Sequence, residues 1–501
     1  MTSLALTSSS PASLKVDALV IGVARGPKGL VLTPGAEPVS GVLGKDLLEA
    51  LVGLGATGKA EQVTQLATFG AKLPPVLVAV GLGDVSEQYA GEALRRAAGA
   101  VTRTLAGTRR VAFSLPARSP EAVRAVAEGA LLGAYTFLSY RTASAAEHRA
   151  AVAEVSLVVP DAKNREVKAA AHRAEIVAAA VALSRDLVNT PASDLHPAEL
   201  ADVAKAHCGK AGVTVEVLDE KALAKGGYGG ILGVGQGSDA PPRLVHLSYK
   251  GGRGAKQKVA LIGKGITFDS GGLSLKPAAG MEEMKMDMGG AAAVICALRA
   301  VAELKLAIDV EAWVPMAENM PSGAAIRPSD VLTMKNGLRV EVNNTDAEGR
   351  LILADAIARA CEDHPDIVVD VATLTGAQLV ALGARTTAVM SNDDALRDRV
   401  VAAATEAGEP SWPMPLPAEL RKGLDSEIAD LVNTGPREGG MLTAGLFLQE
   451  FVTEGVRWAH LDIAGPAYNS GEAYGYTPHG GTGAAVRTFV QLLEDLATEK
   501  L

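Results

Sequence analysis

Short apolar runs alternate with stretches of helical periodicity along the first third of the chain. The pattern predicts strands at residues 15–23, 75–81, 110–115 and 155–160, and helices at 88–105 and 121–138. Strands that alternate with helices are typical of an α/β domain with a largely parallel sheet. We therefore predict an N-terminal α/β domain over residues 1–163.

An alanine-rich stretch follows at residues 164–187, polar at first and apolar later, and it stops at Asn189-Thr190-Pro191. Asn and Pro are typical of a helix end. We interpret residues 164–190 as a connecting helix, although its alanine content is equally compatible with a helix packed within the second domain.

Residues 191–501 repeat the alternation and predict a second α/β domain. Helices are predicted at 197–208, 290–304, 351–362 and 444–452, and strands at 213–218, 243–249, 258–262, 308–315, 366–372 and 458–465. Three of these strands, at 258–262, 308–315 and 366–372, end in polar or glycine-rich loops. Ligand crevices of open α/β sheets lie outside such carboxyl ends.

Charged residues gather in or beside these loops, and three of them alternate within a single segment. Asp346, Glu348 and Arg350 are spaced two residues apart, and in an extended segment alternate side chains share one face. Two carboxylates held close together repel each other unless a cation is bound. The segment therefore predicts a metal site; a charged surface turn is the alternative. The other charged residues of these loops are Lys264, Asp269, Lys276 and Asp287.

Four carboxylates make an oxygen-rich site suited to two divalent ions, which together can polarise a carbonyl group. Lys264 lies among them, but an ammonium has no lone pair, so a counter-ion role is favoured over metal binding as a neutral amine. Lys276 and Arg350 are cations that could face the anion formed when water attacks a carbonyl. The alternative is that each neutralises nearby carboxylates.

Composition excludes several classes of protein. Hydrophobic residues make up 48% and charged residues 21% of the 501 residues, as in globular proteins. No uncharged apolar run is long enough for a transmembrane helix, and residues 1–13 do not resemble a secretory signal, so no membrane partner and a cytoplasmic location are expected. The net charge of −9 argues against general nucleic-acid affinity. Residues 1–165, with 17 Lys and Arg against 13 Asp and Glu, leave a DNA-binding or regulatory role open.

Other candidate sites carry weaker signals. The glycine-rich stretch 226–237 lacks the spacing of a dinucleotide loop and is predicted to be a loop with a turn. The cysteines Cys208, Cys296 and Cys361 lie far apart and are expected to be reduced and structural, with a catalytic thiol as the alternative. No histidine occurs between His246 and His364, which excludes a histidine-based zinc site there.

Five motifs, in order, resemble those of the leucyl (cytosol) aminopeptidase family of dinuclear metallopeptidases. They are GKGITFDSGG at 263–272, MKMDMGGAA at 284–292, ENMPSG at 318–323, NTDAEGRL at 344–351 and DVATLTGA at 370–377. The likeness covers about residues 185–487. It implies an N-terminal α/β domain, a catalytic domain with a mixed central sheet flanked by helices, and a homohexamer.

The resemblance also implies roles for individual residues. Lys264, Asp269, Asp287 and Glu348 would bind the tighter metal ion, which reverses the counter-ion preference for Lys264. Asp269 and Glu348 would bridge to a second, more exchangeable ion that Asp346 also holds. Lys276 would stabilise the tetrahedral anion, and Arg350 would anchor a bicarbonate that acts as general base. The positions near the substrate would be Met284, Asn319, Thr373 and Leu374.

The function expected from this resemblance is the removal of N-terminal residues, preferentially leucine and other apolar residues, from peptides. A metal-dependent phosphoesterase on the same carboxylates is the alternative reaction. Zn²⁺ or Mn²⁺ is expected, with Mg²⁺ or Co²⁺ possible, because carboxylate and amine ligands accept several of these ions.

Overall fold

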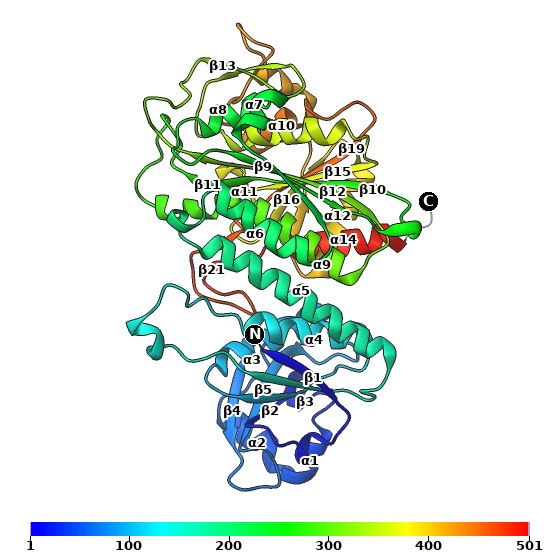
Figure 1. Cartoon of the computed structure of the whole chain (residues 1–501). Helices are drawn as coiled ribbons and strands as arrows, with labels where there is room; N and C mark the ends of the chain where they lie inside the picture. The colour runs from blue at the N-terminus through cyan, green and yellow to red at the C-terminus, as the bar shows by residue number, and fades with distance from the viewer. Residues whose placement is uncertain (1, 499–501) are drawn as a thin grey trace. The chain divides into compact units, whose positions relative to one another are not determined.

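The computed structural model describes residues 2–498 and divides into two compact units (Figure 1). Unit 1 comprises the chain up to Ala182 together with Gly471–His479, and unit 2 comprises Leu183–Ser470 and the chain from Gly480 on. The predicted alanine-rich helix is present as α5 (Arg165–Asn189) and contributes residues to both units. Within the described residues, none of the helices combines the length and apolar character that crossing a bilayer requires.

Unit 1 is built on a seven-stranded sheet in the order β1-β7-β6-β2-β5-β4, with β3 paired to β2. Alternate residues of β2 supply two cores: Val20 joins the core beneath α3 and α4, whereas Leu19 and Ile21 join the core beneath α1 and α2. This period of two is what a strand buried on both faces requires. The strands are β1 (Ser3–Thr7), β2 (Ala18–Gly26), β3 (Gly29–Leu32), β4 (Val63–Ala67), β5 (Val76–Asp84), β6 (Arg110–Ser114) and β7 (Glu154–Val158), and the helices are α1 (Glu37–Leu43), α2 (Asp46–Gly53), α3 (Gly91–Thr104) and α4 (Pro120–Gly133).

Unit 2 contains a nine-stranded sheet in the order β17-β16-β19-β15-β10-β12-β9-β8, with β11 paired to β12. The sheet is mixed, as predicted: β15, β10 and β12 are parallel, whereas β9 and β16 run antiparallel to their neighbours β12 and β19. Helices cover both faces (Figure 1). The strands are β8 (Thr214–Leu218), β9 (Arg243–Tyr249), β10 (Lys258–Gly263), β11 (Gly265–Asp269), β12 (Asp309–Asn319), β15 (Ile367–Ala372), β16 (Thr387–Ser391), β17 (Ser411–Pro413) and β19 (Arg457–Asp462).

The remaining elements of unit 2 are helices and two small sheets. The helices are α6 (Pro197–Lys210), α7 (Glu220–Gly226), α8 (Gly229–Gly235), α9 (Gly289–Leu304), α10 (Gly349–Cys361), α11 (Gly376–Leu382), α12 (Asp394–Ala407), α13 (Gly440–Gln449) and α14 (Val486–Thr498). The small sheets join β13 (Asp330–Thr333), β14 (Arg339–Val342) and β18 (Leu431–Val432), and β20 (Tyr468–Asn469) with β21 (Gly480–Gly481).

The prediction of a loop at residues 226–237 is wrong, because most of this stretch forms helix α8. Tertiary contacts explain the difference. A Cβ atom on Gly229 would lie 2.0 Å from the carbonyl oxygen of Thr333, and one on Gly230 would lie 2.4 Å from that of Leu351. The buried carboxylate of Asp355 accepts a hydrogen bond from Ile231 N. Glycine here permits close backbone packing, and this overrides its poor helix propensity.

The three cysteines are buried and unpaired, in agreement with the predicted structural role. Burial raises the pKa of the Cys208 thiol to about 12 and raises the pKa of Cys296. Thiolates are therefore disfavoured at these positions, which argues against thiol catalysis.

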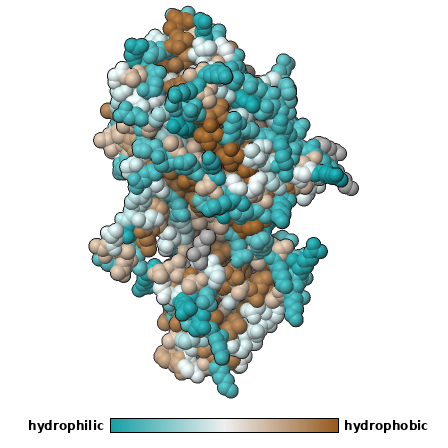
Figure 2. Space-filling model, viewed as in Figure 1, coloured by the Kyte–Doolittle hydropathy of each residue, from teal (hydrophilic) through white to brown (hydrophobic). Residues whose placement is uncertain are grey.

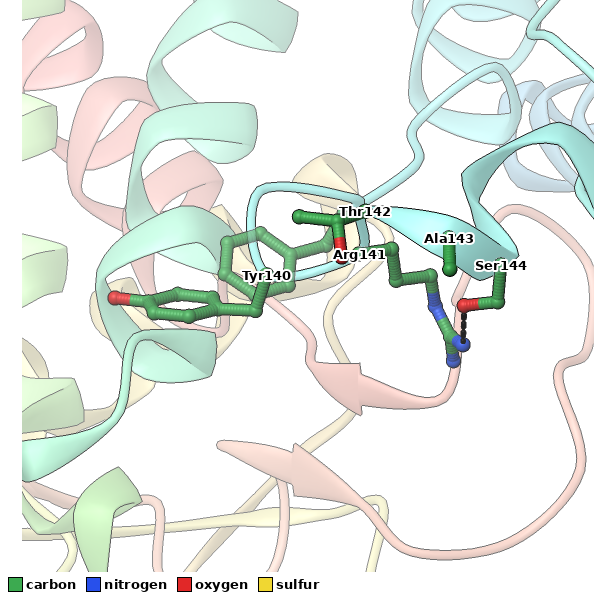
Figure 3. A pocket seen from close by; sticks show the side chains of 6 residues that line it. Tyr140, Arg141, Thr142, Ala143 and Ser144 are labelled. Carbon is green, nitrogen blue, oxygen red and sulfur yellow. Dashed lines mark hydrogen bonds between the residues drawn. The ribbon is translucent and has the colours of Figure 1, made fainter.

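A cavity of about 470 Å³ lies in unit 1, in the loop after α4 (Figure 3). Phe137, Tyr140 and residues 141–144 line it, and Arg141 Nη1 donates to Ser144 Oγ at 3.4 Å. Every site residue predicted from the sequence belongs to unit 2, so none of them lines this cavity. On the face shown in Figure 2, hydrophilic residues surround scattered hydrophobic patches.

Glu311 on β12 is a buried carboxylate with three side-chain partners. His246 Nε2 lies 2.8 Å away, Ser248 Oγ donates at 3.0 Å and Lys250 Nζ donates at 2.5 Å. Burial raises the pKa of Glu311, but these hydrogen bonds outweigh burial and lower the pKa to about 2. A carboxyl group with a lowered pKa in the folded state stabilises the fold above its ordinary pKa of 4.5, and this contribution is lost as the pH falls towards 2.

Glu311→Gln is therefore expected to lower the free energy of unfolding by about 2–3 kcal/mol at pH 7, and by about half as much at pH 3. Calorimetric melting at both pH values measures the difference from the parent chain. Exposed Glu419 provides the control substitution, Glu419→Gln, which should change stability little at either pH. An equal loss at pH 7 and pH 3 for Glu311→Gln would contradict the lowered pKa.

Candidate metal centre

The predicted site residues meet at one edge of the unit 2 sheet. The neighbouring parallel strands β10 and β15 are followed directly by Lys264 and Thr373, and β12 between β10 and β9 ends at Asn319. Strand β11 pairs with the end of β12, so that Asp269 lies opposite Asn319. The three predicted carboxyl ends are therefore adjacent, as the sequence pattern required.

Lys264 lies at the centre of the cluster and is 2% exposed. Its Nζ is 2.8 Å from Asp287 Oδ2 and 2.9 Å from Glu348 Oε1, and it donates to the carbonyl oxygen of Thr373 at 2.8 Å. Burial lowers the pKa of Lys264, but the surrounding carboxylates, Asp287 first, outweigh burial and raise this pKa above its ordinary value. A Cβ atom on residue 349 would lie 2.7 Å from the amine nitrogen, so any larger residue there would displace the Lys264 side chain from its present position.

Lys276 joins two further carboxylates. Its Nζ is 2.8 Å from Asp269 Oδ2 and 2.5 Å from Asp346 Oδ1, and its side chain is 22% exposed. Burial lowers the pKa of Lys276, but Asp269 and the other acidic neighbours outweigh burial and raise this pKa above its ordinary value. Lys276 therefore provides a fixed positive charge on the more open side of the cluster.

The extended conformation predicted for the segment of Asp346, Glu348 and Arg350 is wrong. Glu348 has helical dihedral angles, φ −76° and ψ −37°, and is the N-cap of α10, while Asp346 lies in the preceding turn. Gly349, the first helical residue, lies against the side chain of Lys264, and the apolar run that follows is buried in the core. The turn still directs Asp346 and Glu348 to one place, where ligand oxygens of both residues and of Asp269 lie within 4.8 Å of one another.

Arg350, the second residue of α10, forms no ion pair with these carboxylates. Its Nη1 donates to the carbonyl oxygen of Asn433 at 2.8 Å, and its buried Nε has no hydrogen-bond partner. Burial lowers the pKa of Arg350 to about 10. Arg350 forms no ion pair with a carboxylate among residues 2–498, so the guanidinium does not neutralise its neighbours directly.

The donor set fits divalent metal ions. Four carboxylates face only two ammonium groups, and burial raises the pKa of Asp287, Asp346 and Glu348. Glu348 Oε2 is buried without any hydrogen-bond partner. An unpaired buried carboxylate oxygen is costly unless a cation binds it, so the cluster is suited to hold metal.

Two of the four residues predicted to lie near the substrate contact predicted metal ligands. Thr373 Oγ1 donates to Asp287 Oδ1 at 2.8 Å, and Asn319 Nδ2 donates to Asp269 Oδ1 at 2.8 Å, so both touch predicted metal ligands. Leu374 follows Thr373 in the same loop. Met284 lies in the 3₁₀ helix Met281–Met288, which also carries Asp287, and is partly exposed.

Two supporting residues escaped the sequence analysis. Asn433, after β18, accepts from Asn343 N and donates to the carbonyl oxygen of Asn344, so it shapes the turn that carries Asp346. Asp462, at the end of β19, holds the loop after β15. Asp462 lies within the predicted strand 458–465, but nothing in the local sequence indicates that Asp462 or Asn433 supports a neighbouring loop.

Comparison with protein families agrees with this geometry. Residues 182–490 match the catalytic domain of the cytosol aminopeptidase family, and residues 20–144 match its N-terminal domain. The chain belongs to the cytosol aminopeptidase family. Membership makes it a metal-dependent aminopeptidase, and thus a hydrolase.

Individual relatives cover nearly the whole chain. A probable cytosol aminopeptidase of Streptomyces griseus subsp. griseus is 54% identical over 518 residues, covering 100% of both chains. The bottromycin maturation enzyme BotP in complex with Mn has 39% sequence identity and a TM-score of 0.84, covering 96% of this chain and 100% of its own. A mutant of tomato leucine aminopeptidase has 32% identity and a TM-score of 0.87, covering 99% of this chain and 97% of its own.

Proposed function

We propose that this chain removes the N-terminal residue of peptides, preferentially leucine and other apolar residues, with two divalent metal ions in the cluster. The observation that carries the proposal is the convergence of Lys264 and four carboxylates from the carboxyl ends of β10 and β11, the 3₁₀ helix Met281–Met288 and the start of α10. The structural likeness to a leucine aminopeptidase supports the substrate preference.

The proposed ligands divide into two groups. Lys264, as a neutral amine, binds the first ion together with Asp269, Asp287 and Glu348. Asp269 and Glu348 would also hold the second ion, together with Asp346; the proximity of oxygens from these three residues supports this division. When bound, the ions polarise the scissile carbonyl and activate a water molecule. We favour Zn²⁺ or Mn²⁺, with Mg²⁺ and Co²⁺ as alternatives, and the Mn bound by BotP supports Mn²⁺.

The two remaining cations have separate roles in this proposal. Lys276, partly exposed beside the carboxylates, stabilises the negative charge that develops on the carbonyl oxygen. Arg350, whose Nε is buried and unpaired, would hold a bicarbonate ion, which would supply a general base. Thr373, Leu374, Asn319 and Met284 contact the substrate.

Two further properties belong to the same proposal. We propose a homohexamer, and the exposed apolar side chains Val380, Trp412 and Ile428 of unit 2 support a surface covered by other subunits. We also propose a cytoplasmic location, in keeping with the name cytosol aminopeptidase carried by the relatives.

Removal and return of metal tests the proposed function. The purified chain is expected to hold two divalent ions and to hydrolyse leucine p-nitroanilide, and exhaustive chelation should lower this activity by at least about a hundredfold. Adding back Zn²⁺, Mn²⁺, Co²⁺ or Mg²⁺ separately, with metal analysis by mass spectrometry, identifies the ions that restore it. Full activity in a metal-free sample would refute the proposal.

A parallel assay separates the two alternatives raised by the sequence. Hydrolysis of p-nitrophenyl phosphate by the reconstituted chain, without hydrolysis of leucine p-nitroanilide, would indicate a phosphoesterase. A salt-dependent shift of duplex DNA would support the additional DNA-binding role.

A further inference from the structure

The loop of residues 373–375 connects the metal cluster to strand β19. On its inner side, the carbonyl oxygen of Thr373 accepts from Lys264 Nζ at 2.8 Å, and Thr373 Oγ1 donates to Asp287 Oδ1 at 2.8 Å. The first residue of the loop is therefore fixed by two proposed metal ligands.

The outer side of the loop is held by Asp462. This carboxylate is fully buried at the end of β19, opposite Ala372 in the parallel pairing of β15 and β19. Its Oδ1 accepts from Leu374 N at 3.2 Å, and its Oδ2 accepts from Thr375 Oγ1 at 2.7 Å. One side chain thus binds the two loop residues that contact neither Lys264 nor Asp287.

Asp462 is matched to the donors around it. Its Oδ1 also accepts from Ala464 N at 3.1 Å, so three donors and no acceptor meet the carboxylate. Asparagine would turn an NH₂ group towards one of these donors and leave that donor unpaired. The three donors therefore favour a carboxylate over an amide of the same size.

A second hydrogen bond, made by a side chain of α11, also joins the loop after β15 to the loop after β19. Thr375 Oγ1 accepts from Gln378 N at 3.0 Å and caps helix α11. The side chain of Gln378 is buried, and its Oε1 accepts a hydrogen bond at 2.7 Å from the backbone N–H of Gly465, which lies in the loop after Asp462. The loops after β15 and β19 are thus linked in both directions.

We propose that Asp462 is a positioning residue for substrate recognition, which holds Leu374 and Thr375 so that the loop presents Thr373 and Leu374 to the N-terminal residue of the peptide. The inference rests on the proposed aminopeptidase function. Loss of the outer contacts leaves the inner contacts of Thr373 intact, so the metal ligands keep their places. Asp462 therefore acts on substrate affinity much more than on the rate of the chemical step.

The test compares Asp462→Asn with the parent chain, both reconstituted with the same metal. KM for leucine p-nitroanilide is expected to rise about tenfold, kcat to stay within about threefold, and the metal content to remain at two ions per chain. The dissociation constant of the product L-leucine, measured by calorimetry, should rise in parallel with KM. An unchanged KM and an unchanged dissociation constant would overturn the inference.

Variants of Thr375 separate position from charge. Burial lowers the pKa of Arg350, and the negative charge of Asp462 opposes this effect, so Asp462→Asn also alters the surroundings of Arg350. Thr375→Val replaces the hydroxyl with a methyl group, which removes both the contact with Asp462 and the cap of α11 without changing any charge, and it should raise KM about threefold, whereas Thr375→Ser keeps both contacts and should retain the parent value. A fall in kcat for Asp462→Asn with a silent Thr375→Val would mean that Asp462 acts through Arg350, and would overturn the proposal.

Failure of the inference about Asp462 can be distinguished from failure of the proposed function. If Asp462→Asn does not fold, Thr375→Val decides, and an unchanged KM for that variant rejects the inference. An inactive but fully metallated parent chain would instead reject the proposed function before any variant is compared.

Discussion

Replacing Glu348 with alanine is expected to remove both metal ions and to lower kcat/KM for leucine p-nitroanilide by at least about a thousandfold, or about 4 kcal/mol. Glu348 is 1% exposed, its Oε1 faces Lys264 and its Oε2 has no partner. It is the one proposed ligand at the start of a helix, where its backbone is fixed. Loss of this carboxylate leaves neither ion with a complete set of ligands.

Metal analysis by mass spectrometry and steady-state kinetics measure the two effects on the same sample. The matched control is Arg350→Ala, only two residues further along. Arg350 is also buried but donates to the carbonyl oxygen of Asn433 instead of a proposed ligand. The Arg350→Ala variant should keep two metal ions per chain while its kcat falls. Retention of both ions by Glu348→Ala, or their loss from Arg350→Ala, would contradict the proposed division of roles.

The central strands could be predicted because burial on both faces leaves a clear signal. β10 and β15 are near-continuous apolar runs, and their polar ends became adjacent because parallel neighbours end at the same edge. Strands β1, β3 and β4 escaped prediction because they are short and incompletely buried. β11 escaped because its five residues lie within a glycine-rich motif that resembles a loop.

The site was predictable in membership but not in geometry. The charges of Asp346 and Glu348 indicated a cation, but the local pattern placed the helix start at residue 351, since Gly349 is a poor helix former and its packing against Lys264 joins segments far apart in the chain. Asp462 was invisible for a related reason. It accepts from backbone groups of Leu374 and Ala464 and from the hydroxyl group of Thr375, and a pairing between segments so far apart in the chain leaves no local residue pattern.

Lys276→Met is expected to lower kcat by about 10²- to 10³-fold while both metal ions remain bound. Methionine keeps much of the length of the side chain and removes its charge. The Nζ group contacts Asp269 and Asp346 on the partly exposed side of the cluster, where it can reach an oxygen that gains negative charge. Loss of a preorganised charge that acts mainly in the transition state should change kcat more than KM.

The competing explanation is that Lys276 only neutralises two carboxylates, and metal occupancy separates the two roles. Bound ions supply positive charge themselves, so Lys276→Met should lower the melting temperature of the metal-free chain more than that of the metal-loaded chain. Lys335→Met is the matched control, because Lys335 is similarly buried and pairs with Glu362 at 2.8 Å. It should leave kcat within about threefold of the parent. If Lys276→Met behaves like this control when two ions are bound, the ammonium is a counter-ion, and stabilisation of the developing anion must come from the metal ions alone.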